Sequence, residues 1–188
     1  NDWTVKCDFG APTSDVTTSQ SSSSMNVAYR AATTNTTNSI ASYRVYPFPT
    51  EAPSFGPSVL LPDPSDAVAS PFGWHDTDGN AGPEFTITRG NNVYAYDDAA
   101  NIDSPGSSPD GTGTLTFDFP ANLTQPANTY TDAANVNLFY VNNMVHDYLV
   151  HYGFDEAAGN FQNTNYSGNG AGNDYVIAES QDGGGTNN

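Results

Sequence analysis

Basic residues are scarce in this sequence. Four Lys and Arg stand against 21 Asp and Glu in 188 residues, which gives a formal net charge of −17. A surface of this charge repels phosphate groups, so nucleic acid and anionic membranes are excluded as partners. The acidic composition, with many Gly, Asn, Ser and Thr residues, is typical of secreted proteins, including some that bind calcium. Simple solubility is the alternative explanation for most of these charges.

Cysteine and long apolar runs are equally scarce. Cys7 is the single cysteine, so an internal disulfide is excluded. No apolar run approaches 18 residues, so no membrane-spanning helix is predicted. Residues 1–10 also lack the charged start and apolar core of a signal peptide. We therefore expect an internal piece of a longer precursor rather than a cytosolic protein.

The first 39 residues differ in character from the rest of the chain. Residues 1–10 alternate apolar and polar side chains, which predicts one half-buried strand. Residues 11–39 are dominated by Ser, Thr and Asn, which is typical of a linker. The opening strand is therefore expected to belong to a different module from residues 40–188.

Short alternating runs predict a β-rich region up to Pro120, with one further strand near the end of the chain. Prolines between positions 47 and 64 favour extended, non-helical segments there. Gly90 and the neighbouring asparagines suit a turn or a hairpin between two of the strands. The predicted strands are 42–48, 84–87, 93–96, 114–119 and 174–178.

One stretch, 131–153, carries a sustained helical pattern. Thr131 or Asp132 is suited to cap its start, and Gly153 stands where a left-handed residue ends a helix. Apolar positions on two neighbouring rows predict a helix buried over much of its circumference. The first row contains Val136, Tyr140, Asn143 with Met144, and Asp147 with Tyr148, and the second contains Leu138, Val141, Val145, Leu149 and Tyr152.

The apolar side chains of the second row would normally face another lobe of the protein. Exposing its four aliphatic side chains forfeits about 6 to 12 kcal/mol, which is comparable with the net stability of a whole domain. We therefore expect residues 131–188 to be poorly packed unless a partner covers them.

No complete catalytic set is present in the sequence. It contains no HExxH, CxxC or GxSxG motif. His146 and His151 lie five residues apart on the predicted helix, so they point about 140° apart and cannot share a metal as i, i+4 histidines do. Both are interpreted as hydrogen-bonded helix histidines.

The segment HDTDGNAGPE, 75–84, is the strongest candidate for a metal site. Asp76, Asp78 and Asn80 place oxygen ligands at alternate positions around a glycine, and Glu84 follows within reach. This resembles the first half of a calcium loop without its full twelve-residue pattern. An ordinary Asx-rich turn is the alternative. A second acidic group, made of Asp97, Asp98 and Asp103, is interpreted as a solvated loop.

Several long motifs carry a family resemblance. They are SPFGWHDTDG (70–79), EFTITRGNNVYAYDD (84–98), SPDGTGTLTFDFP (108–120), NLFYVNNMVHDYLVHYGFDEAAGNFQ (137–162) and GNDYVIAESQDGGGTNN (172–188). Together, over residues 40–188, they resemble the fungalysin family of secreted zinc metallopeptidases. Residues 1–10 also resemble the last strand of that family's inhibitory propeptide, which implies that 11–39 contains the maturation junction.

The resemblance implies a thermolysin-like enzyme that cleaves peptide bonds in proteins. Its zinc is held by two histidines of HExxH and a downstream glutamate, and these residues are absent from this sequence. In thermolysin-like enzymes an Asn-Asn-Ala strand runs along the cleft edge and pairs with the extended substrate. The resemblance therefore assigns substrate contacts to Asn187 and Asn188.

The predicted fold class is α+β. An irregular β-rich N-terminal lobe (40–130) precedes one long buried helix (131–153) and a loop with a cleft-edge strand (154–188), which together form an incomplete thermolysin-like domain. The predicted function is the N-terminal fragment of a secreted zinc endopeptidase, whose missing C-terminal half brings the zinc site. The alternatives are a non-catalytic secreted acidic β-rich module that binds calcium or a partner, and a complementing half whose second chain docks non-covalently.

Overall fold

The computed structural model describes residues 40–183 of the chain. Three of the sequence predictions fall elsewhere. The strand at 1–10, the linker at 11–39 and the substrate-binding pair Asn187 and Asn188 lie outside the described residues.

The described strands form two small sheets. In the first, β1 (Ser42–Val45) lies between β2 (Val59–Pro62), which runs antiparallel to it, and β4 (Thr116–Phe117), which runs parallel. In the second, β3 (Val93–Asp97) pairs in parallel with β5 (Val176–Ser180). Three short 3-10 turns complete the regular structure: Thr112–Thr114, Ala127–Thr129 and Glu156–Ala158.

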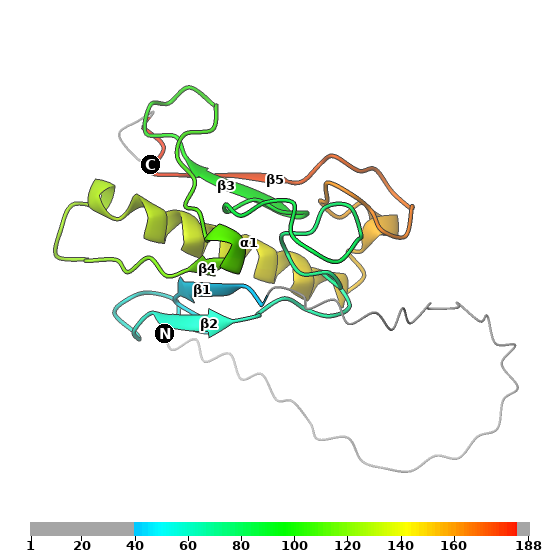
Figure 1. Ribbon diagram of the computed structural model, residues 1–188, viewed down its shortest axis with the longest axis horizontal. Coiled ribbons are helices and arrows are strands. Elements are labelled where there is room, and N and C mark those ends of the chain that lie inside the picture. Colours follow the sequence, from blue (N-terminus) through cyan, green and yellow to red (C-terminus); the bar gives the residue numbers. More distant parts are fainter. Residues whose placement is uncertain (1–39, 184–188) are drawn as a thin grey trace, which may run out of the picture. The chain divides into compact units, whose positions relative to one another are not determined.

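A single α-helix, α1 (Thr131–Val150), lies between the two sheets of the described residues. It contacts β1 on one side and β3 and β5 on the other (Figure 1). Val136, Phe139 and Tyr140 on this helix are almost completely buried. One helix with several strands in separate sheets makes this an α+β fold, as predicted.

Most predicted strands are present with shifted ends. The runs 42–48, 93–96 and 174–178 contain or overlap β1, β3 and β5. The run 114–119 is strand only at Thr116–Phe117, because the chain enters it from a 3-10 turn that ends with Leu115 in the left-handed region.

The prediction of a strand at 84–87 was wrong. Ile87 forms only an isolated bridge with Asp110, and the predicted hairpin is reduced to a bridge between Arg89 and Tyr94. Strand β2 was not predicted, because its sequence lies in the proline-rich stretch that was expected to be merely extended.

The helix begins and ends differently from its prediction. No side chain caps its start: Thr131 Oγ1 donates instead to Gln181 Oε1 at 3.0 Å, so the predicted cap was wrong. At the other end the helix stops at Val150. Gly153 has φ of 92°, and the Phe154 amide reaches back to the Leu149 carbonyl at 3.1 Å, as its sequence predicted.

The two predicted rows of α1 have different environments. In the first row Val136, Tyr140, Asn143 and Asp147 are buried, whereas Met144 is half-buried and Tyr148 is 61% exposed. In the second row Leu138 and Val141 are half-buried, whereas Val145 is 46% exposed and Tyr152 is 72% exposed. The helix is therefore buried on one face, and its second row is left partly uncovered by residues 40–183.

Asp147, 3% exposed on α1, accepts four hydrogen bonds. Ser70 Oγ at 2.7 Å and His146 Nδ1 at 3.0 Å donate to its Oδ1. Trp74 Nε1 at 2.8 Å and the Asp66 amide at 3.0 Å donate to its Oδ2. The carboxylate thus holds the segment 66–74 against the helix with its charge fully hydrogen-bonded, which is the condition for burying a charge.

The core centres on an aromatic stack beside Trp74. The His75 ring lies nearly parallel to the rings of Phe117 and Phe139, with centroids 5.2 and 5.1 Å away. Burial lowers the pKa of His75 to about 4, so the ring is neutral. Its Nδ1 lies 2.9 Å from the Arg89 carbonyl oxygen and must donate to it, which leaves Nε2 as an acceptor.

No helix within residues 40–183 is long and apolar enough to cross a membrane.

Replacing Asp147 with Ala is expected to lower the free energy of unfolding by about 3 kcal/mol, because buried donors of the segment 66–74 lose their acceptor. Asp132→Ala, in the first turn of the same helix, is the matched control and is expected to cost about 0.3 to 1 kcal/mol. Urea unfolding of both variants measures the difference. Equal losses would show that the buried carboxylate has no special role.

Candidate functional site

The acidic loop after Trp74 brings three predicted ligands together. Asp76, Asp78 and Glu84 each offer a carboxylate oxygen, and these oxygens lie within 4.8 Å of one another. Asp76 is 1% exposed, whereas Asp78 and Glu84 are exposed. The fourth predicted residue, Asn80, is exposed, and its amide donates to Asp78 Oδ1 at 2.8 Å. Their role as calcium ligands stays a prediction.

The loop turns through its own hydrogen bonds. Gly79 has φ of 76°, a conformation that favours glycine, and its amide donates to Asp76 Oδ1 at 2.8 Å. Glu84 folds back so that its Oε2 accepts from both the amide and the hydroxyl of Thr77. The Glu84 amide in turn donates to the His75 carbonyl at 3.1 Å. These contacts hold the start and the end of the loop together.

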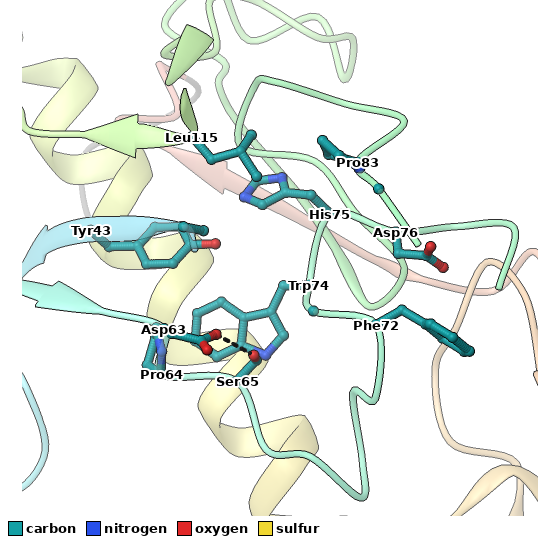
Figure 2. Close-up of a pocket in the computed structure, with 13 residues that line it drawn as sticks. Tyr43, Asp63, Pro64, Ser65, Phe72, Trp74, His75, Asp76, Pro83 and Leu115 are labelled. Atoms are coloured by element: carbon teal, nitrogen blue, oxygen red, sulfur yellow. Dashed lines mark hydrogen bonds between the residues drawn. The ribbon is translucent and has the colours of Figure 1, made fainter. Parts of the chain in front are cut away.

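The two oxygens of Asp76 differ in their partners. Oδ1 accepts from the Gly79 amide and from the Tyr166 hydroxyl, but Oδ2 is buried and has no hydrogen-bond partner among the described residues. Figure 2 shows Asp76 and the neighbouring His75 pointing to opposite sides of the chain. Burial raises the pKa of Asp76, and the nearby charges of Glu84 and Asp78 act in the same direction.

Tyr166 joins this loop to the segment after α1. Its hydroxyl lies 3.0 Å from the Asp76 carbonyl oxygen and 2.7 Å from Asp76 Oδ1, and its ring meets Phe72 edge-on at 5.1 Å. Burial and the bond to Asp76 raise the pKa of Tyr166. Sequence reasoning missed this residue, because it lies 90 positions from Asp76 with no local motif around it.

In the second acidic group, Asp98 and Asp103 lie together with Glu179 of β5, whereas Asp97 accepts a hydrogen bond from the Ser107 hydroxyl. Its interpretation as a solvated loop was wrong for Asp98, which is 2% exposed. The Asp98 carboxylate accepts from the amides of Ile102 and Asp103, and Glu179 accepts from the Tyr96 hydroxyl at 2.7 Å. Asp98 is therefore the anchor of a turn.

The pocket of Figure 2 is too small for a substrate. It lies beside Tyr43, Trp74 and His75 and has a volume of about 30 Å³, roughly the space of one water molecule. A larger groove of about 550 Å³ runs along α1. Its apolar lining includes Tyr46, Phe48, Leu123, Leu138 and Val141.

The described histidines do not fit a zinc site. His75 is in the core, His146 contacts Asp147 and Asn160, and His151 Nε2 lies 3.0 Å from Asp66 Oδ2. Within residues 40–183, the groups of three candidate metal ligands contain carboxylates only. Zinc sites normally include histidine or cysteine, so no zinc chemistry is assigned to these residues.

The family model described as fungalysin metallopeptidase (M36) matches residues 42–188. The match covers both sheets, the helix and the acidic loop.

Individual relatives agree with this match. A protein named Extracellular metalloproteinase MEP from Leptosphaeria maculans is 40% identical over 156 residues, and one named Extracellular metalloproteinase mep from Aspergillus terreus is 43% identical over 156 residues. A similarly named protein from Fusarium vanettenii is 42% identical over 157 residues. Each alignment covers 79% of this chain, which spans only 23% of the length of these relatives.

Replacing Tyr166 with Phe is expected to lower the free energy of unfolding by about 1 to 2 kcal/mol, because the buried oxygens of Asp76 lose their donor. Tyr148→Phe is the matched control: its exposed hydroxyl donates to the exposed Tyr152 hydroxyl, so a change below about 0.5 kcal/mol is expected. Thermal unfolding compares the two. A neutral Tyr166→Phe would contradict the assigned contact.

Proposed function

Because this chain belongs to the fungalysin metallopeptidase family, we propose that it is the N-terminal part of the catalytic domain of a secreted zinc endopeptidase. The observation that carries the proposal is the family match over residues 42–188. The short coverage of the relatives supports its fragment character, since 23% of their length leaves room for a further lobe. The names of these relatives, extracellular metalloproteinases, support secretion.

The zinc ligands are proposed to lie in the remaining part of the longer protein. Two arguments support this placement: the present sequence lacks HExxH, and its described histidines are occupied by structural hydrogen bonds. The 188-residue chain alone is therefore expected to hydrolyse no peptide bond.

The part of α1 left uncovered is proposed to receive the remaining catalytic half. Val145 and Leu149 are 46% and 37% exposed, and Tyr152 at the helix end is more exposed still. The apolar groove along Leu138 and Val141 continues this surface on the same helix. Covering such side chains contributes about 1.5 to 3 kcal/mol for each one fully buried, which supports a docking role.

The proposed substrate contacts are Asn187 and Asn188, which follow strand β5 in the sequence. An extended peptide pairs with a strand edge through main-chain hydrogen bonds, and a side-chain amide there adds both a donor and an acceptor. This chain would thus form one wall of the cleft. Residues 1–10 are proposed to be the end of the inhibitory propeptide, with the maturation junction in 11–39.

Isolation of the protein from its native source tests this proposal. The expected product exceeds 19.9 kDa, or carries a tightly associated second chain, and contains about one zinc. Its hydrolysis of casein should be lost on chelation of zinc and restored by added zinc. A lone 19.9 kDa chain that contains no zinc and does not hydrolyse casein would contradict the proposal and favour a non-catalytic module.

Replacing Asn188 with Ala in the complete protein is expected to lower kcat/KM about tenfold, through the loss of about 1.4 kcal/mol of substrate hydrogen bonding. Zinc content and the unfolding temperature should not change. Asn169→Ala is the matched control, since this asparagine lies in an exposed loop and its side chain contacts Ser167. If the two variants retain the same kcat/KM, the assignment of Asn188 is wrong.

A further inference from the structure

We propose that Asp76, Asp78 and Glu84 bind one calcium ion that ties the acidic loop to the segment around Tyr166. This inference is separate from the proposed zinc chemistry, since it concerns residues within this chain alone. It rests on the spacing of the three carboxylates, on the unpaired oxygen of Asp76 and on the contrast with the second acidic group.

The spacing suits a single hard cation. Calcium binds oxygens at about 2.3 to 2.6 Å, so oxygens on opposite sides of the ion lie about 5 Å apart. The oxygens that Asp76, Asp78 and Glu84 offer all lie within 4.8 Å of one another. The group contains no histidine or cysteine, which favours calcium over zinc.

The buried oxygen of Asp76 points to a ligand. Asp76 is 1% exposed, and its Oδ2 has no hydrogen-bond partner in the described part of the chain. A buried ionised oxygen without a hydrogen-bond partner is strongly destabilising, because it has lost its hydrogen bonds to water and no protein group replaces them. Two further carboxylates close by add to this cost, and a divalent cation among the three relieves both effects.

The second acidic group shows what a structural cluster looks like in this protein. Asp98 is as buried as Asp76, but both of its oxygens accept backbone hydrogen bonds, from Ile102 and Asp103. Glu179 is engaged by the Tyr96 hydroxyl. No binding is therefore expected there, and the group supplies a matched control.

The calcium ion would organise a contact between distant parts of the chain. Asp76 Oδ1 accepts from Tyr166, whose amide in turn donates to Glu156 Oε1 at 2.7 Å. Fixing the Asp76 carboxylate therefore fixes the segment after α1. Two of the three ligands are exposed, so half-saturation is expected at about 0.1 to 1 mM calcium, in the range of extracellular modules.

Equilibrium dialysis of the complete protein, stripped of loosely bound cations by chelation, tests the proposal with calcium itself as the probe. The double variant Asp78→Asn, Glu84→Gln keeps the buried Asp76 and is expected to bind one calcium fewer than the wild type. Asp103→Asn should bind as many as the wild type. Unchanged stoichiometry in the double variant, or an equal loss in Asp103→Asn, would overturn the proposal.

A second measurement does not depend on other calcium sites in the complete protein. Calcium is expected to slow amide hydrogen exchange in the segment 163–170 of the wild type at least about tenfold, and to leave it unchanged in the double variant. Zinc content and peptide hydrolysis at saturating zinc are recorded in parallel, so that loss of the proposed enzyme function is distinguished from loss of the calcium site. If calcium leaves the exchange rate of this segment unchanged in the wild type, the proposed coupling between the calcium site and the segment is contradicted.

Discussion

The buried Asp147 carboxylate is the interaction on which the rest of this structure depends. A charge that is 3% exposed is tolerated only because four donors surround it, and three of them come from the segment 66–74. This requirement fixes where the segment lies on α1. Trp74, held by its own hydrogen bond to Asp147, then begins the chain that leads through His75 in the core to Asp76 in the acidic loop. One helix carboxylate therefore positions both the aromatic core and the candidate metal site.

The helix has a second consequence for function. Val136 and Tyr140 of its first row lie in the hydrophobic core, whereas Val145, Leu149 and Tyr152 are exposed. A row of exposed apolar side chains on a central helix is normally covered by another protein surface. Under our proposal, the natural covering surface is the remaining part of a longer metallopeptidase, which the family match and the short coverage of the relatives support.

The sequence predicted local features well and distant partners poorly. Alternation identified β1 because Tyr43 and Val45 both face the core, and periodicity identified the buried row of α1. Alternation failed at 84–87, where the Glu84 side chain turns back to Thr77 and the segment does not pair as a strand. The donors of Asp147 from the segment 66–74 and the contact of Tyr166 with Asp76 could not be predicted, since they join residues more than 70 positions apart and no periodic pattern records them.

Amide hydrogen exchange along α1, compared between the 188-residue chain and the complete protein, tests the central claim most directly. Residues 138–152 are expected to exchange much more slowly in the complete protein, because the remaining lobe covers the exposed row. The buried strand β1, which is already enclosed in the described residues, should change far less. Identical exchange along the helix in both forms would contradict the claim that this chain is one part of a larger catalytic domain.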